Sequence, residues 1–180
     1  MRRVVALVGL SGVGKSTLVR RLVEQIPLLH LQASDLIKAE QARRQTTASS
    51  SEELRTGPVL DNQQLLIDGF ARASASVDGL VLFDGHAVIF GDASVTDVPS
   101  SVFAALTCEQ ILMIWAEPGA ILQRRLNDTR RIRPELDAGL LEQQQRRAGE
   151  AAARIASELG IPFACFSSED VHAVVEALRA

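Results

Sequence analysis

The chain has 180 residues, of which 47% are hydrophobic and 23% charged, and its formal net charge at pH 7 is −3. A chain of this length and apolar content is expected to form one domain with a sizeable core, over residues 1–180. The weakly negative balance provides no basic field for nucleic acid, and no apolar run approaches the roughly 20 residues of a membrane span. We therefore expect a cytoplasmic protein that binds neither nucleic acid nor membranes. Its two cysteines, Cys108 and Cys165, are predicted to be buried free thiols.

Five short apolar runs, none of which alternates cleanly with polar residues, predict strands that are buried on both faces. Segments with helical spacing lie between them, so the chain is predicted to be an α/β protein with a five-stranded parallel sheet and helices on both faces. The predicted strands are Val4–Val8, Leu28–Leu31, Leu80–Phe83, Ile111–Trp115 and Pro162–Phe166. The predicted helices are Thr17–Gln25, Leu36–Gln45, Asn62–Ser76, Ser100–Leu106, Ala120–Leu126, Glu135–Leu159 and Glu169–Leu178, and Phe90–Ser100 is predicted to be a loop.

A glycine-rich motif follows the first predicted strand directly. Residues 9–16 read G-L-S-G-V-G-K-S and fit the pattern G-x-x-x-x-G-K-[ST] at every fixed position, with a strand before them and a helix after them. Glycines let the backbone bring several N–H groups close to phosphate oxygens, and the first turn of the helix adds the positive end of its dipole. The alternative is a tight turn with a surface lysine. The motif in this context favours a nucleotide-phosphate binding loop (P-loop) of the NTPase type.

The motif assigns a role to each of its polar side chains. Lys15 is predicted to hold the β- and γ-phosphates of ATP and to act in catalysis, and the Ser16 hydroxyl is predicted to ligate Mg²⁺. The predicted nucleotide-binding residues are Gly9, Ser11, Gly12, Val13, Gly14, Lys15, Ser16 and Thr17, together with Arg124.

A change of composition follows the second predicted strand and covers residues 34–58. Ligands of open parallel sheets dock at the carboxyl ends of strands, so this segment is predicted to be a substrate-binding flap. If a second nucleotide binds here, Arg43, Arg44 or Arg55 would hold its monophosphate, and Ser34 or Asp35 would contact its base or sugar. The alternative is a solvated surface excursion.

Asp84 follows the third predicted strand directly and is followed by a glycine. In phosphate-transferring folds an acid beside the phosphate loop holds the Mg²⁺ environment or orients the nucleophile, so Asp84 is predicted to be a catalytic and metal-binding residue. The alternative is an Asp that caps the next turn. His86, two residues further on, suits a substrate contact and a structural hydrogen bond equally well.

Five arginines lie within ten residues, with only Asp128 opposing them. They are Arg124, Arg125, Arg130, Arg131 and Arg133. Such a cluster on an exposed helix would repel itself, whereas guanidinium groups bind phosphate oxygens well. Residues 124–135 are therefore predicted to form a lid that excludes water and in which Arg131 and Arg133 stabilise the developing charge. The alternative is a plain basic patch on the surface.

Several of these segments resemble the archaeal-type adenylate kinases, in which D-T-H-A-x-I precedes a loop that ends in proline, and an R-x-R lid precedes an alanine-rich helix. The resembling segments are Phe83–Ile89, the loop to Pro99, Ile111–Glu117, Arg124–Asp128, Arg131–Arg133 and Glu142–Gly160. The resemblance implies a nucleoside monophosphate kinase fold, with Mg-ATP as the donor and AMP as the leading acceptor. It also implies that some relatives are homo-oligomers.

The function expected from the sequence is therefore transfer of the γ-phosphoryl group of ATP to AMP or another nucleoside monophosphate. Two alternatives stay open. The first is a P-loop kinase that phosphorylates a small molecule other than a nucleotide. The second is a nucleotide-binding regulatory ATPase that acts through a protein partner.

Overall fold

The computed structural model describes residues 1–44, 59–91, 95–127 and 137–180, with the side chains of 59–61 excepted. Its centre is a parallel sheet of five strands in the order β2-β3-β1-β6-β7. The strands are β1 (Arg2–Val8), β2 (Leu28–Gln32), β3 (Gly79–Asp84), β6 (Cys108–Trp115) and β7 (Phe163–Ser167). All five predicted strands are thus confirmed.

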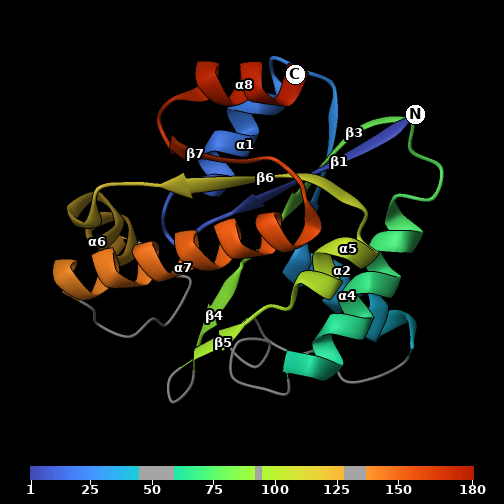
Figure 1. The fold of residues 1–180 in the computed structure, drawn as a ribbon, viewed down its shortest axis with the longest axis horizontal. Coiled ribbons are helices and arrows are strands. Elements are labelled where there is room, and N and C mark those ends of the chain that lie inside the picture. Colours follow the sequence, from blue (N-terminus) through green and yellow to red (C-terminus); the bar gives the residue numbers. More distant parts are fainter. Residues whose placement is uncertain (45–58, 92–94, 128–136) are drawn as a thin grey trace.

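Helices cover both faces of the sheet (Figure 1). Right-handed crossovers place α1 and α8 together on one face, and α2, α4, α5 and α7 on the other. Their bounds are α1 (Lys15–Val23), α2 (Ala33–Arg43), α4 (Val59–Ala73), α5 (Ser100–Ala105), α7 (Ala138–Leu159) and α8 (Val171–Arg179). A further helix, α6 (Pro118–Asn127), follows the carboxyl end of β6 and packs against α7.

The core lies between β1, β6 and the helices. Residues 5–8 of β1 have no exposed surface, because strands on both sides and helices on both faces enclose them. The inward face of α7 consists mainly of alanines, which lets this long helix lie close to β6 and β7. Asp137 caps its first turn by accepting a hydrogen bond from Leu140 N at 2.7 Å, and Gly160 ends it in a left-handed conformation.

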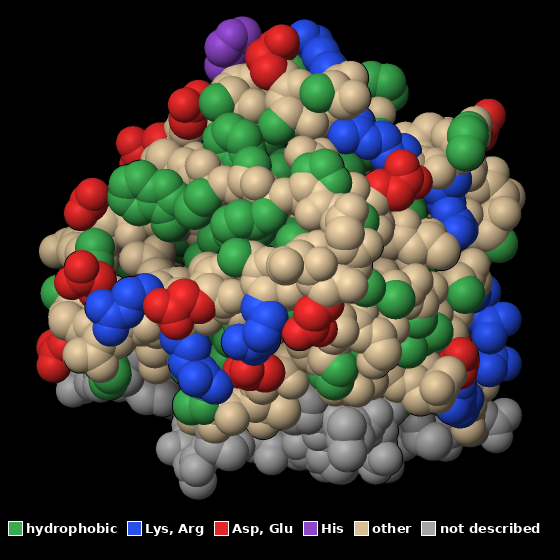
Figure 2. Space-filling model, viewed as in Figure 1, with side chains coloured by type: hydrophobic (Ala, Val, Ile, Leu, Met, Phe, Trp, Pro, Cys, Tyr) green, Lys and Arg blue, Asp and Glu red, His purple; other side chains and the backbone are tan. Residues whose placement is uncertain are grey.

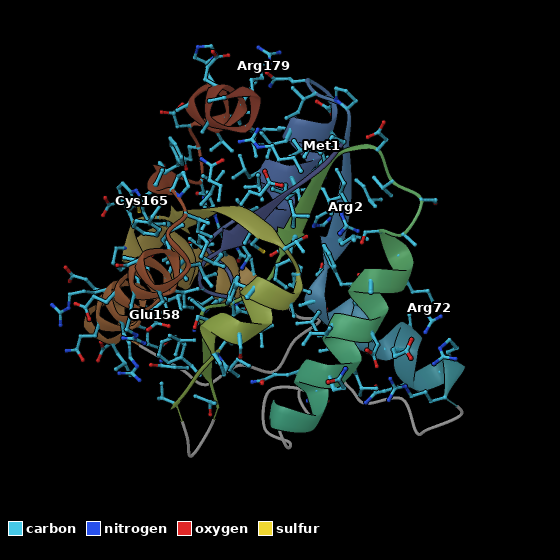
Figure 3. All side chains as sticks on the ribbon, turned by 45° about the vertical axis from the view of Figure 1, so that its right-hand side comes forward. Met1, Arg2, Arg72, Glu158, Cys165 and Arg179 are labelled. Carbon is cyan, nitrogen blue, oxygen red and sulfur yellow. The ribbon has the colours of Figure 1, made fainter. Side chains whose placement is uncertain are left out.

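The two edge strands differ from the expectation that every strand is buried on both faces. Most residues of β2 and β7 are only partly buried, because each strand has a neighbour on one side only. Phe163 is 37% exposed and Cys165 is exposed, so the prediction of a buried thiol is wrong for Cys165 (Figure 3). Figure 2 shows apolar side chains gathered on the side of the molecule where β6, β7 and α7 lie. Cys108 is buried as expected, and burial raises the pKa of its thiol to about 12.

The segment predicted to be a loop, Phe90–Ser100, contains part of a small antiparallel hairpin. Strands β4 (Val88–Phe90) and β5 (Val95–Asp97) pair with Ile89 beside Thr96. Each strand has three residues, which is too short for an alternating pattern to show in the sequence. Asp97 binds Arg147 at 2.9 Å and Arg154 at 2.8 Å, and these ion pairs attach the hairpin to α7.

Helix boundaries shift by a few residues from those predicted. The most important case is α2, which begins at Ala33 and not at Leu36, so Ser34 and Asp35 lie in its first turn.

Within the described residues, no helix combines the length and the apolar character that crossing a membrane requires.

Candidate active site

The P-loop connects β1 to α1 at the carboxyl edge of the sheet. Gly14 is the N-cap of α1 and has a φ of 110°, a left-handed conformation that favours glycine. A Cβ atom on Gly9 would lie 2.5 Å from the carbonyl oxygen of Ile114 in β6, so any side chain there would clash with the neighbouring strand. The two glycines thus allow the chain to leave β1 against β6 and to enter α1 in a tight turn.

Two consecutive arginines at the end of α6 hold the loop from outside. Arg124 donates a hydrogen bond to Val13 O at 2.7 Å, and Arg125 donates two to Ser11 O at 3.1 and 2.9 Å. In a trans peptide the C=O and the following N–H point in opposite directions. The N–H groups of Gly12 and Gly14 therefore point away from the two guanidinium groups. An anion cradled by the loop would meet these amides, because the carbonyl oxygens are engaged elsewhere.

Lys15, the first residue of α1, and Asp84, the last residue of β3, meet beneath the loop. Both side chains are buried, and Lys15 Nζ lies 3.6 Å from Asp84 Oδ1 while it donates a hydrogen bond to Gly9 O at 2.8 Å. Burial acts to raise the pKa of Asp84, but Lys15, His30 and His86 outweigh it, so the pKa lies below its ordinary value. Asp84 is therefore a carboxylate at neutral pH.

Two histidines flank this pair. His30 Nε2, from β2, lies 3.5 Å from Asp84 Oδ2. His86 Nδ1 lies 2.8 Å from Gly9 O, and because a carbonyl oxygen only accepts, the ring carries a proton on this nitrogen. His86 is otherwise exposed, so its ring supports the P-loop and also faces solvent.

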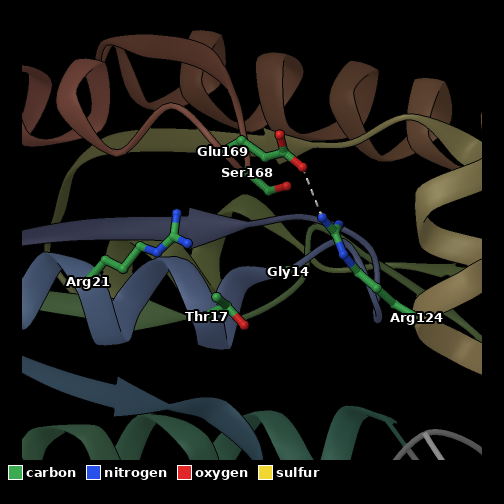
Figure 4. Close-up of a pocket in the computed structure, with 6 residues that line it drawn as sticks. All are labelled: Gly14, Thr17, Arg21, Arg124, Ser168 and Glu169. Atoms are coloured by element: carbon green, nitrogen blue, oxygen red, sulfur yellow. Dashed lines mark hydrogen bonds and ion pairs between the residues drawn. The ribbon is translucent and has the colours of Figure 1, made fainter. Parts of the chain in front are cut away.

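A cavity of about 450 Å³ opens beside the P-loop (Figure 4). It is lined by Gly14, Thr17, Arg21, Arg124, Ser168 and Glu169. Arg124 forms an ion pair with Glu169 at 3.4 Å across it. The Ser168 hydroxyl is buried and has no hydrogen-bond partner within the described residues. A buried polar atom beside a cavity is a natural contact for a ligand.

The carboxyl end of β2 supplies polar groups on the other side of the P-loop. Gln32 pairs with Asp84 in the sheet register, and its Nε2 donates to Ser34 Oγ at 2.8 Å. Ser34 in turn lies 3.4 Å from Asp35 Oδ1. The first turn of α2 thus presents a hydroxyl and a carboxylate close to Asp84.

Arg43 lies at the opposite end of α2 and has a buried partner. The carboxylate of Glu40 is 1% exposed and binds Arg43 at 2.7 Å, Arg44 at 2.9 Å and Arg72 of α4 at 3.4 Å. Arg44 also forms an ion pair with Asp68 of α4. These charges join α2 to α4 and engage the guanidinium group that was expected to hold a monophosphate.

The structure brings together the P-loop residues, Arg124, Asp84 and His86 at one edge of the sheet, with Ser34 and Asp35 nearby. Their roles stay predictions. Three other predicted site residues, Arg55, Arg131 and Arg133, and most of the predicted flap and lid lie outside the described residues.

Sequence reasoning missed His30, Arg21, Ser168 and Glu169, and gave Arg125 no site role. His30 interrupts an apolar strand run, and Ser168 and Glu169 follow the last predicted strand. These positions in the sequence could have identified all three as candidate site residues. Arg21 has no such signal, because exposed arginines on helices are common.

The chemistry of these groups fits Mg²⁺ and a nucleotide. Mg²⁺ is usually held by one or two protein oxygens together with phosphate oxygens and water. The exposed Ser16 hydroxyl and the Asp84 carboxylate are oxygen donors of this kind. The described residues contain no cluster of three His, Cys, Asp or Glu side chains that could bind a metal without a phosphate. The unpaired Ser168 hydroxyl and the cavity provide room for the rest of a nucleotide.

The parallel sheet, the glycine loop and the buried lysine define a P-loop NTPase-like fold. The chain belongs to a family described as an AAA domain, which matches residues 8–142. A comparison with curated proteins gives no match.

Three solved structures with the same fold are kinases or a resistance protein. A shikimate kinase from Bacteroides thetaiotaomicron has a TM-score of 0.56 at 18% identity, covering 98% of this chain and 96% of its own. A tunicamycin resistance protein from Deinococcus radiodurans has a TM-score of 0.55 at 15% identity, covering 89% and 97%. A gluconokinase from Sinorhizobium meliloti has a TM-score of 0.50 at 13% identity, covering 98% and 89%. The resemblance to adenylate kinases is thereby supported at the level of the P-loop kinase fold.

Proposed function

We propose that the protein is a phosphotransferase that moves the γ-phosphoryl group of Mg-ATP to a small-molecule acceptor. The observation that carries this proposal is the contact between Lys15 and Asp84 beneath the P-loop. A lysine that can bind phosphate oxygens thus lies beside a carboxylate that can hold Mg²⁺ or orient a nucleophile.

We assign each part of ATP to a group of residues on the donor side of the site. The amides of the P-loop and Lys15 would hold the phosphates, and Ser16 and Asp84 would hold Mg²⁺, which neutralises charge on the phosphates. The cavity between Thr17, Arg124 and Ser168 would take the ribose and the base, since its volume is in the range of small-molecule sites. No covalent intermediate is required, because this chemistry depends on position and charge.

The acceptor side favours a hydroxyl compound without a phosphate. The exposed carboxylate of Asp35 places negative charge here, which opposes a dianionic monophosphate, whereas Asp84 is paired with Lys15. Arg43 lies eight residues beyond Asp35, about 12 Å along α2, and is engaged by Glu40. Ser34, Asp35 and His86 would instead bind hydroxyl groups of the acceptor. Two of the similar structures are named as a shikimate kinase and a gluconokinase, so enzymes with this fold act on acceptors other than nucleotides.

A nucleoside monophosphate is the second candidate acceptor, because the adenylate kinase resemblance implies it. Its phosphate would need the arginines of the predicted flap and lid, Arg55, Arg131 and Arg133, to offset the Asp35 carboxylate. These arginines keep the roles predicted from the sequence. A cytoplasmic location and the formation of homo-oligomers also stay predictions.

A panel of acceptors tests the proposal. Purified protein is incubated with Mg-ATP and either nucleoside monophosphates or polyols, hydroxy acids and amino sugars, and products are identified by mass spectrometry. We expect a phosphorylated non-nucleotide product, and K15A should lower kcat/KM on the order of 10²- to 10³-fold without unfolding the protein. A nucleoside diphosphate as the main product would instead establish the second candidate. A regulatory ATPase would instead hydrolyse ATP at a rate that no acceptor changes and that a protein partner increases.

A further inference from the structure

His30 is a half-buried residue, with 29% of its side chain exposed, that the proposed reaction does not use. It lies in β2, and its Nε2 atom is buried without a hydrogen-bond partner in the described part of the chain. The same atom faces Asp84 Oδ2 at 3.5 Å. Buried polar atoms are almost always paired, so an imidazole nitrogen in this place requires a reason.

The sheet register places His30 behind Asp84. Gln32 pairs with Asp84 and His30 pairs with Leu82, two residues back from the end of each strand. Side chains two residues apart share a face, and a strand rises about 3.3 Å per residue, so His30 sits about 7 Å back from the sheet edge. The P-loop lies at that edge, so His30 can support the carboxylate and is set back from bound phosphates.

The two oxygens of Asp84 have different kinds of partner. Oδ1 faces Lys15 Nζ at 3.6 Å, and Lys15 also binds Gly9 O. Under the proposed function Lys15 must serve the phosphates as well, so its hold on Asp84 is shared. His30 has no competing partner among the described residues. Its approach to Oδ2 is therefore not shared with a second partner among these residues.

We propose that His30 is a positioning residue that fixes the Asp84 carboxylate in the orientation in which it serves the Mg²⁺ of bound ATP. With the nucleotide bound, Nε2–H would donate to Oδ2, which would leave the remaining lone pairs of the carboxylate for the metal environment. This inference rests on the proposed function. Groups that orient metal ligands in this way typically raise metal affinity or activity on the order of 10- to 100-fold.

The test is a titration of Mg²⁺ against the full-length protein saturated with a fluorescent, non-hydrolysable ATP analogue. In H30L the half-saturating Mg²⁺ concentration should rise on the order of 10- to 100-fold, while the affinity for the analogue without Mg²⁺ stays unchanged. H30Q, whose amide nitrogen can take the place of Nε2, should restore Mg²⁺ dependence toward that of the wild type. H172L, on the exposed face of α8, is the matched control and should behave as the wild type.

A half-saturating Mg²⁺ concentration in H30L equal to that of the wild type would overturn the inference. So would a loss of analogue affinity that is the same with and without Mg²⁺, because a merely structural role predicts that pattern. If H30L does not fold, H30N replaces it, since its shorter amide cannot reach Oδ2, and the comparison with H30Q decides in the same way. A wild-type protein that binds no Mg-ATP would instead refute the proposed function itself.

Discussion

The guanidinium group of Arg125 holds the carbonyl oxygen of Ser11 with two hydrogen bonds, 3.1 Å from Nε and 2.9 Å from Nη2. Arg125 is the second residue of the predicted lid, 124–135, and only Leu126 and Asn127 follow it in α6. The same contact therefore connects the P-loop to the root of that segment. The side chain of Arg125 can in this way affect the P-loop and the predicted lid together.

We expect R125A to weaken ATP binding about tenfold, because a charged donor that contributes 1.5 kcal/mol or more is lost from the loop. R125K should restore only part of the affinity, since an ammonium group cannot reproduce two parallel bonds. Equilibrium binding of an ATP analogue measures the effect. R146A, an exposed arginine of α7, is the control. Equal affinities for R125A and R146A would show that the contact does not shape the loop.

The Ser168 hydroxyl predicts opposite effects on stability and on binding. S168A removes a buried oxygen that has no partner within the described residues, so the free energy of unfolding of the ligand-free protein should stay constant or rise. Affinity for ATP should fall about fivefold to tenfold, because a hydrogen bond to the ligand is worth roughly 1 kcal/mol. Thermal unfolding with and without an ATP analogue measures both quantities. S157A, on the exposed face of α7, should change neither. A stability loss in S168A without a change in binding would contradict the nucleoside site.

Gly9 tests how closely the P-loop must approach β6. In G9A the new methyl group would meet Ile114 O at 2.5 Å, and the backbone of a central strand has little freedom to move. We expect a loss of about 1–3 kcal/mol in the free energy of unfolding, measured by urea denaturation. Gly119 in α6 has nothing within 4 Å of a Cβ, so G119A should stabilise the protein by up to about 1 kcal/mol. Equal effects of the two substitutions would refute the close approach.

We expect the ion pairs of Glu40 to make the free energy of unfolding fall as the solution becomes acidic. Hydrogen bonds from Arg43 and Arg44, with a further contribution from Arg72, lower the pKa of its carboxyl from 4.5 to about 2. A depressed folded-state pKa means that the carboxylate contributes stability above about pH 4.5, and that this contribution is lost as pH falls toward 2.

Chemical denaturation between pH 2 and 6 compares the wild type with E40Q. The variant should be less stable near pH 6, because three arginines then surround a neutral amide, and its stability should fall less steeply below pH 4.5. E24Q, at the exposed end of α1, is the control and should keep the slope of the wild type. Identical slopes for E40Q and the wild type would mean that this carboxylate is not stabilised by its arginines.

The sequence predicts the fold class, the five strands and the P-loop correctly. These features depend on local patterns, namely continuous apolar runs of strand length and glycines at fixed spacing. It also placed Asp84 beside the loop, because parallel strands bring their carboxyl ends to one edge of the sheet. The β4–β5 hairpin escaped prediction because each strand has only three residues and the pairing is anchored from outside, through Asp97 and α7.

Which polar side chains meet depends on how the strands and helices pack together. His30 reaches Asp84 through the pairing of β2 with β3, and Ser168 reaches Gly14 through the pairing of β7 with β6 and the turn into α8. Likewise, Arg43 was expected at the acceptor but is engaged by Glu40 one turn earlier in the same helix. The physical reason is that charge and hydrogen-bond partners depend on distance in space, whereas the sequence records only separation along the chain.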